Sequence, residues 1–298
     1  MCVKIVAMEK RCILCPRNCK VNRNRSVGFC GAPNNLVVAH ADLHFGEEPF
    51  VVGTGGSGAV FFSHCNLKCA FCQNAELRDG KIGKKVTVAR LVEIVKELEQ
   101  KGASTINFVS GMHYADLVVE ALEAYKPKVP VVWNTNAYEK VETIAKLSKY
   151  VDVFLPDLKF CSKELSARVA TCPNYFEVAT SAILEMKKQK PVDLFDKNGV
   201  LTSGVAVRHL ALPNHTDDSK KIVDFLSKNL NGTILCLMSQ YVPFDRAKDM
   251  PDLNRKLKPI EYNSVLHYAQ QKLKGQIFAQ DFSSATTDFI PKWNADNI

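Results

Sequence analysis

Short apolar runs rich in β-branched residues alternate with amphipathic helical stretches from residue 59 to residue 274. Six of these runs predict strands, at residues 59–63, 105–109, 129–133, 151–155, 205–210 and 233–237. The predicted helices lie near residues 88–101, 115–125, 139–149, 174–189, 218–230 and 260–274. Such alternation is typical of parallel strands joined by crossover helices. The expected fold is therefore of the α/β class, a partial (βα)6 TIM-like barrel with a small Cys-rich N-terminal extension.

Composition divides the chain into three parts. Residues 1–55 are rich in Cys, Arg, Asn and Gly and are expected to be irregular, ending in a flexible glycine-rich run at 53–58. We therefore expect a Cys-rich N-terminal module at 1–55, a core barrel at 56–280 and a loosely packed C-terminal tail at 281–298. A hydrophobic content of 46% over 298 residues is enough for one large core.

Membrane and nucleic-acid partners are not expected. The longest apolar stretches have only the length of a strand, and the N-terminus lacks the order of a signal peptide, so we expect a soluble, cytoplasmic protein. The formal charge of +8 comes from 39 basic and 31 acidic residues. No basic stretch is interleaved with aromatic residues, as single-strand binding would require. Six basic residues lie among the first cysteines: Lys10, Arg11, Arg17, Lys20, Arg23 and Arg25.

Polar residues follow or end each predicted strand. Cysteines follow the first strand, Ser110 follows the second, and Asn134 and Thr135 follow the third. Asp157 and Lys159 follow the fourth. In a parallel α/β barrel the carboxyl ends of all strands meet on one rim, where catalytic groups gather. The sequence therefore predicts one site on this rim, although such residues can also serve only as helix caps.

Three cysteines in the first of these loops carry the most specific signal. Cys65, Cys69 and Cys72 can ligate three irons of a [4Fe-4S] cluster and leave the fourth iron open to a substrate or cofactor. Clustered cysteines in an intracellular chain of this size bind metal more often than they form disulfides. The alternatives are a zinc ion with His64 as fourth ligand, or unliganded thiols.

The spacing CxxxCxxC with Phe71 before the last cysteine resembles the signature of radical S-adenosylmethionine (SAM) enzymes, whose six-stranded barrel the predicted fold also resembles. The string from Cys65 to Asn74 resembles glycyl-radical-enzyme activases, such as pyruvate formate-lyase activating enzyme. Nearly the whole chain resembles a less characterised activase-like group. The resembling segments are Cys15-Pro16-Arg17-Asn18-Cys19, His44-Phe45-Gly46-Glu47-Glu48-Pro49, Asn107-Phe108-Val109, Leu155-Pro156-Asp157-Leu158-Lys159 and Met238-Ser239-Gln240-Tyr241.

This resemblance implies an oxidoreductase that binds a [4Fe-4S] cluster and SAM. One electron from a flavodoxin- or ferredoxin-like protein would cleave SAM to a 5′-deoxyadenosyl radical, which abstracts hydrogen from a protein or peptide substrate. Activation of a glycyl-radical enzyme is one form of that reaction. The alternatives are radical modification of a small molecule, and a non-catalytic iron-sulfur electron carrier.

The resemblance also implies contacts to SAM. Phe71 would pack near the adenine, and Asp157 and Lys159 match an Asp-x-Lys pair that contacts the cofactor. Asn134 and Thr135 stand where activases carry polar groups. The usual Gly-Gly-Glu segment is absent, so Ser110 or its local backbone would receive the methionine amine. The alternatives are an exposed Asp157–Lys159 ion pair and, for His209, a core position. Arg208 needs an acidic partner if it is buried.

A second group of four cysteines, Cys12, Cys15, Cys19 and Cys30, precedes the triad. Four thiols can close a zinc site or ligate a second iron-sulfur cluster. Their spacing matches neither common zinc fingers nor typical ferredoxins. Reduced, unliganded thiols are the alternative.

Overall fold

A computed structural model describes residues 11–284, 293, 295, 296 and 298 of the chain. Its strands are β1 (Leu36–His44), β2 (Ser57–Phe62), β3 (Lys84–Val86), β4 (Thr105–Val109), β5 (Val131–Thr135), β6 (Val153–Pro156), β7 (Leu194–Phe195), β8 (Leu201–Leu210), β9 (Ile234–Met238) and β10 (Ile277–Ala279). Its α-helices are α1 (Pro49–Val52), α2 (Ala75–Arg78), α3 (Val88–Gln100), α4 (Ala115–Ala124), α5 (Val141–Leu147), α6 (Lys163–Ala170), α7 (Tyr175–Gln189), α8 (Thr216–Asn229) and α9 (Pro259–Lys272).

The strands form one mostly parallel sheet in the order β10-β9-β8-β6-β5-β4-β2-β1-β3, with β7 paired to β8. The run from β2 to β10 is parallel throughout, and β1 joins it antiparallel to β2. The edge strands β10 and β3 do not pair with each other, so the sheet is an open, partial barrel. The predicted α/β class is confirmed, and each of the six predicted strands is present.

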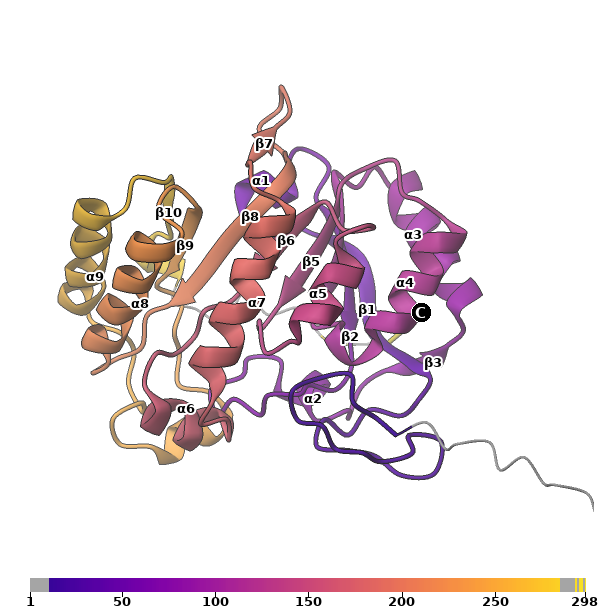
Figure 1. The fold of residues 1–298 in the computed structure, drawn as a ribbon, viewed down its shortest axis with the longest axis horizontal. Helices are drawn as coiled ribbons and strands as arrows, with labels where there is room; N and C mark the ends of the chain where they lie inside the picture. Colours follow the sequence, from indigo (N-terminus) through magenta and orange to yellow (C-terminus); the bar gives the residue numbers. More distant parts are fainter. Residues whose placement is uncertain (1–10, 285–292, 294, 297) are drawn as a thin grey trace, which may run out of the picture.

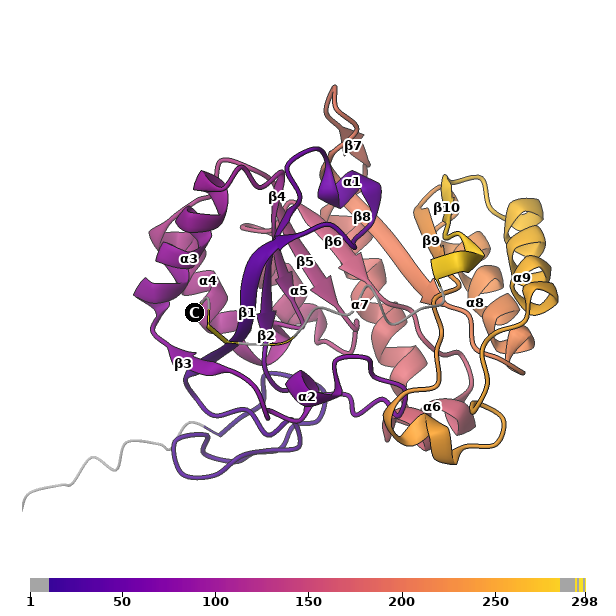
Figure 2. The same ribbon diagram turned by 180° about the vertical axis from the view of Figure 1, so that it is seen from behind.

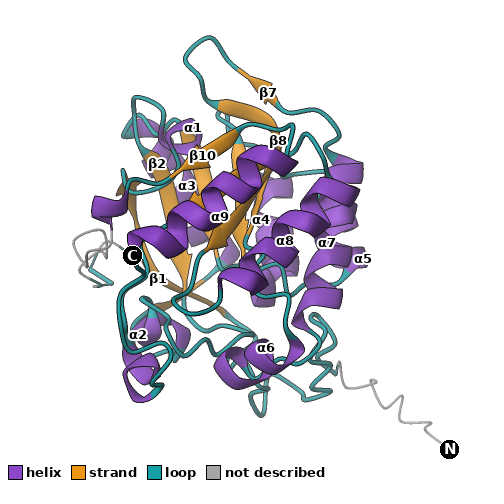
Figure 3. Cartoon of the chain, turned by 90° about the vertical axis from the view of Figure 1, so that its left-hand side faces the viewer, coloured by secondary structure: helices purple, strands orange, loops and turns teal. Residues whose placement is uncertain are grey.

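Helices cover the outer face of the sheet (Figure 1). From the side, α8 and α9 lie in front of the strands, and α7 and α5 lie to the right of them (Figure 3). Helix α3 shows why these segments form helices that pack on the sheet. The Thr87 side chain caps its first turn by accepting a hydrogen bond from the Arg90 amide, and the apolar residues of α3 recur at helical spacing. The buried face consists of Leu91, Ile94, Val95 and Leu98. Because helices cover one face and side chains fill the other, every residue of β4 and β5 is buried.

Three details of the sequence prediction are wrong. Ser57 and Gly58 were expected in the flexible glycine-rich run, but they are the buried first residues of β2. Residues 36–44 were expected to be irregular, but they form β1, since an apolar run with β-branched residues can extend the sheet at its antiparallel edge. The third predicted strand begins two residues later than expected, at Val131, because Pro130 has no N–H for the ladder. Asn134 and Thr135 are therefore the last residues of β5 and do not follow it.

The two ends of the sheet carry different segments. Residues 11–35 lack helix and strand and lie with α2 at the end to which the parallel strands point, whereas α1 lies at the opposite end (Figures 1 and 2). Most of the predicted tail at 281–298 lies outside the described residues, but Trp293 packs against Phe61 with 5.0 Å between ring centroids. The helices of the described part are all too short or too polar to cross a membrane.

Candidate functional site

A cavity of about 660 Å³ lies inside the partial barrel and opens to solvent. Its volume falls in the range of ~300–1,000 Å³ that is usual for ligand and cofactor sites. The three triad cysteines and all six residues predicted to contact the cofactor line it. They are Cys65, Cys69, Cys72, Phe71, Ser110, Asn134, Thr135, Asp157 and Lys159. The cysteines of the second group are not among the lining residues.

The loop that carries the triad is held by bonds to distant parts of the chain. The amide of Ala70 donates to the Val169 carbonyl at 2.7 Å, and the amide of His64 donates to Leu77 at 2.7 Å. The thiol sulfur of Cys65 accepts hydrogen bonds from the Leu67 amide and the Asn136 side chain, each at 3.4 Å. These N–H donors would stabilise a thiolate at Cys65. The loop is therefore shaped before any metal binds.

The triad thiols suit a cluster that brings its own positive charge. Burial raises the pKa of Cys69 to about 12 and that of Cys72 to about 11, and it also raises the pKa of Cys65. The nearby Lys159 opposes this shift in each case. Without metal the three thiols therefore stay protonated, and iron would displace their protons on binding.

The donor set fits a cluster of several irons, because each cysteine of such a cluster binds a different iron. Within the described residues, no three His, Cys, Asp or Glu side chains converge closely enough to hold a single metal ion. His64, the expected fourth ligand of a zinc site, does not line the cavity. Its ring packs instead near Gly80 and the ring of His113.

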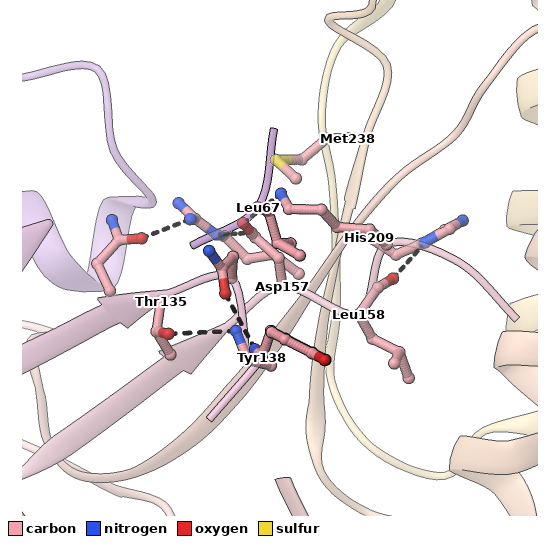
Figure 4. A network of polar contacts seen from close by, with 12 residues as sticks. Leu67, Thr135, Tyr138, Asp157, Leu158, His209 and Met238 are labelled. Carbon is pink, nitrogen blue, oxygen red and sulfur yellow. Dashed lines mark hydrogen bonds and ion pairs between the residues drawn. The ribbon is translucent and has the colours of Figure 1, made fainter. Parts of the chain in front are cut away.

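Asp157 and Lys159 form a buried ion pair inside the cavity. The ammonium of Lys159 lies 2.6 Å from one oxygen of Asp157, and the guanidinium of Arg208 lies 2.8 Å from the other. Burial alone would raise the pKa of Asp157, but Arg208 and Lys159 outweigh it and hold the pKa below its usual range. Figure 4 shows Asp157 within this network, with Thr135 on one side and Leu158 and His209 on the other. The alternative of an exposed ion pair is wrong.

Arg208 has the acidic partners that its place in a buried strand requires. Besides Asp157, it donates to Glu47 at 3.1 Å and to the Asn134 side-chain oxygen at 2.6 Å, and Glu48 lies 3.8 Å away. Burial would lower the pKa of Arg208, but the surrounding carboxylates raise it. Glu47 and Glu48 were not predicted as site residues. Two features of the sequence could have identified them. A buried Arg208 needs an acidic partner, and the two glutamates lie in a segment that resembles the activase-like group.

Two histidines near the cavity have structural roles. His209 is buried, and its ring nitrogens lie 2.8 Å from the Leu158 carbonyl and 2.8 Å from the Ser219 hydroxyl. The alternative that His209 is a satisfied core histidine is therefore confirmed. His113 is buried outside the cavity, with one ring nitrogen 2.7 Å from the Ser63 carbonyl.

Glu139 holds the carboxyl end of β5 through hydrogen bonds to two of its side chains. One of its carboxylate oxygens accepts hydrogen bonds from the Trp133 indole at 2.9 Å and from the Thr135 hydroxyl, whereas the other oxygen has no hydrogen-bond partner among the described residues. Burial raises the pKa of Glu139 to about 7, although both hydrogen bonds oppose the shift. The Thr135 hydroxyl is thus held by a carboxyl group that does not itself line the cavity and that can be neutral.

Replacement of Glu139 by glutamine should change how stability depends on pH. Because the folded-state pKa lies above the unfolded-state value, the folded protein binds more protons, so this group lowers stability as pH rises from about 4.5 to about 7. The change is on the order of 3 kcal/mol. Thermal melts at pH 5 and pH 8 should show a smaller fall in Tm for Glu139→Gln than for the wild type. An equal fall in both proteins would contradict the shifted pKa.

The second cysteine group lies in the loops before β1. Its four thiols are not in disulfides, and Cys15 and Cys30 are buried. The amides of Phe29 and Ala32 donate to the sulfurs of Cys19 and Cys30 at 3.3 and 3.4 Å. Burial raises the pKa of Cys15 to about 11, and the neighbouring thiols contribute to this. The four thiols are therefore close enough to interact electrostatically.

Arg17 links this second group to the triad loop. Its guanidinium donates to the Asn66 carbonyl at 3.1 Å, directly after Cys65, and to the Thr171 carbonyl at 2.7 Å at the end of α6. The Asn66 side chain accepts in turn from Asn136, which also contacts Cys65. The N-terminal loops thus help to hold the wall of the cavity that carries the thiols.

Comparisons with known proteins agree with these observations. The family model of the radical SAM superfamily matches residues 59–226, more than half of the chain. An uncharacterized protein of Methanocaldococcus jannaschii is 33% identical over 272 residues, which cover 88% of this chain and 75% of that protein. The 7-carboxy-7-deazaguanine synthase of Methanothermobacter thermautotrophicus is 31% identical over 96 residues, 32% of this chain and 39% of the synthase.

A solved structure shares the fold. The crystal structure of HydG, a maturase of the [FeFe]-hydrogenase, aligns with a TM-score of 0.50 and 12% identity. The alignment covers 74% of this chain and 50% of the maturase, so the chain spans about half of that protein's length. At this level of identity the likeness supports the open, mostly parallel α/β architecture and nothing finer.

Proposed function

The chain belongs to the radical SAM superfamily, and from this premise we propose that Cys65, Cys69 and Cys72 hold the [4Fe-4S] cluster at which SAM is cleaved. Members of the superfamily are enzymes that use such a cluster, SAM and a reductant. When bound, these groups supply a 5′-deoxyadenosyl radical that abstracts a hydrogen atom from the substrate. The observation that carries the proposal is that the triad shares one cavity with Phe71 of its own loop and with five polar residues at or just after the carboxyl ends of β4, β5 and β6.

The residues of the cavity have distinct roles in this proposal. The thiolates of the triad bind iron, and Phe71 packs near the adenine of SAM. Asp157 and Lys159 present a fixed donor and acceptor to SAM, because their ion pair is buried and Arg208 anchors it. Ser110 has φ of 57°, and its amide donates to the Asn134 carbonyl at 2.9 Å, which turns the chain toward the cavity. Ser110 would thus stand where the methionine amine is received, beside Asn134 and Thr135.

We propose a protein or peptide as the substrate, with activation of a glycyl-radical enzyme as one form of the reaction. The activase-like string from Cys65 to Asn74 supports this, and so does the opening of the cavity to solvent. The experiment is to add the macromolecular and small-molecule fractions of a cell extract separately to reduced enzyme with SAM. Deoxyadenosine release should rise with the macromolecular fraction, and protease treatment should remove the effect. Stimulation by the small-molecule fraction alone would contradict a protein substrate.

Radical modification of a small molecule is the second candidate. The size of the cavity and its buried charged groups favour it, because small-molecule sites are concave and place a few polar groups within an apolar wall.

Whichever class of substrate is correct, we expect a flavodoxin- or ferredoxin-like protein to supply the electron, and we expect the reaction to take place in the cytoplasm. The division into an N-terminal module, a barrel and a tail likewise stays a prediction.

We propose that the second cysteine group holds a structural metal centre, either zinc or another iron-sulfur cluster. The cluster is favoured, because no three His, Cys, Asp or Glu side chains of the described residues converge closely enough to hold a single ion. The four free thiols, the amide donors to two sulfurs and the link through Arg17 support the metal centre. A protein with alanine at Cys65, Cys69 and Cys72 should keep this metal, because the two groups are separate. Additional serines at Cys15 and Cys30 should remove it. Elemental analysis after purification checks both results, and the same metal content in both proteins would contradict the site.

A further inference from the structure

Glu47 and Glu48 belong to a loop that enters the cavity opposite the triad loop, and Glu47 accepts a hydrogen bond from the Asn134 side chain at 3.0 Å. They follow β1, which runs antiparallel to β2 with His44 beside Ser57 at the start of that strand. The loop after β1 therefore enters the cavity from the amino ends of the parallel strands, whereas the triad loop follows their carboxyl ends. Figure 2 shows the same arrangement, with α1 and α2 at opposite ends of the sheet. Both glutamates line the cavity that the triad lines.

The network that joins Glu47 and Glu48 to Asp157 and Lys159 through Arg208 has more carboxyl groups than cations. Three carboxyl groups, those of Glu47, Glu48 and Asp157, lie around Arg208, and Lys159 is the second cation of the network. The guanidinium already donates to Asp157, Glu47 and Asn134. His44 also lines the cavity, and burial lowers its pKa, so it is neutral near pH 7.

Glu48 has an acceptor that nothing satisfies. Its Oε2 atom is buried and has no hydrogen-bond partner among the described residues, and the nearest guanidinium nitrogen of Arg208 is 3.8 Å away. An unsatisfied buried polar group costs about 1–3 kcal/mol unless a ligand supplies the partner. Burial raises the pKa of Glu48 to about 7, with Glu47 adding to the shift and Arg208 opposing it.

We propose that Glu47 and Glu48 form the recognition subsite for a protonated amine or guanidinium group of the substrate, an inference that rests on the proposed function of this cavity. Such a group supplies the N–H donor that Glu48 lacks and balances the excess of carboxylates. A carboxylate or phosphate of a substrate would instead be repelled by the carboxylates of Glu47 and Glu48. Arg208 could not offset this repulsion, because its guanidinium already donates to Asp157, Glu47 and Asn134. With its cation held at this subsite, the substrate extends toward the triad, where hydrogen is abstracted.

The test uses anaerobically reconstituted holoenzyme with SAM and three small probes: butylamine, butylguanidine and the neutral isostere butan-1-ol. Ligand-observed NMR titrations measure their binding. A cationic probe should bind about tenfold tighter than the alcohol, as expected for a charge-assisted hydrogen bond. Glu48→Gln should abolish this preference, whereas Glu120→Gln, the same change at an exposed position on α4, should keep it.

Equal binding of the alcohol and the cations to wild-type enzyme would overturn the proposal without any variant, so it stays testable if Glu48→Gln misfolds. An unchanged preference in Glu48→Gln would also overturn it. So would a joint loss of SAM and amine binding in that variant, because Glu48 would then contact SAM. If wild-type enzyme does not bind SAM, the proposed function fails. If it binds SAM and shows no preference for cations, only this inference fails.

Discussion

Replacement of Cys69 by alanine should abolish the cluster of the cavity and with it all SAM cleavage. Two thiolates would remain for three irons, and no described cysteine other than Cys65 and Cys72 lines the cavity to replace Cys69. We expect a loss of at least ~10³-fold in deoxyadenosine formation, since the electron that cleaves SAM would have no route. Cluster absorbance and the effect of SAM on the electron paramagnetic resonance of the reduced cluster should be lost in parallel.

Cys161→Ala provides the matched control. Cys161 is a half-buried free thiol that does not line the cavity, so its loss should leave cluster absorbance and SAM cleavage near wild-type levels. If Cys69→Ala kept its cluster signal and its activity, the assignment of the triad would be wrong. A loss in both variants would indicate a general effect of removing thiols.

Replacement of Arg208 by methionine should destabilise the protein by about 3–5 kcal/mol at pH 8, because it leaves Glu47, Glu48 and Asp157 together without their shared cation. In the wild type the pKa of Asp157 is lowered, so this group contributes stability above its unfolded-state pKa that is lost as pH falls. In the variant the three carboxyl groups lack Arg208 and take up protons as pH falls, whereas Asp157 of the wild type stays ionised at pH 4 because its pKa is lowered. The difference between wild type and variant should therefore shrink from pH 8 toward pH 4. Urea unfolding at both pH values measures it.

Arg168→Met is the control for Arg208. Arg168 pairs with Asp252 at the surface, with 42% and 32% of the two side chains exposed, and such pairs contribute about 0–1 kcal/mol. A loss of stability at Arg208 no larger than that at Arg168 would contradict the buried network. A loss that is independent of pH would show that missing packing, and not unpaired carboxylates, is its cause.

The alternating pattern predicted the central parallel strands because every residue of β2, β4, β5 and β6 is buried, so that each of these strands reads as a largely apolar run. The rule that polar residues after parallel strands meet on one rim also placed the triad with Ser110, Asp157 and Lys159, which share one cavity. This rule could not identify Glu47 and Glu48, because they follow the antiparallel strand β1 and reach the cavity from the amino ends of the parallel strands. The strand β1 was itself not predicted.

The local sequence pattern also could not decide whether a polar residue of a strand lines the cavity or packs in the core. His209 and Arg208 are neighbours on β8, yet His209 bonds to Leu158 and Ser219 while Arg208 reaches into the cavity. Successive residues of a strand point to opposite faces, but which face borders a cavity depends on the closure of the whole sheet. Likewise, the distance in sequence between Arg17 and Asn66 gave no sign that the N-terminal loops support the triad loop.

The most direct test of the central claim is the reductive cleavage of SAM by wild-type protein. The protein is reconstituted anaerobically with iron and sulfide, reduced with dithionite and supplied with SAM, and 5′-deoxyadenosine and methionine are quantified by chromatography. Formation of both products in equal amounts, and only when reductant and SAM are both present, is the predicted result. A fully loaded cluster that yields no deoxyadenosine would contradict radical chemistry at the triad and favour an iron-sulfur electron carrier.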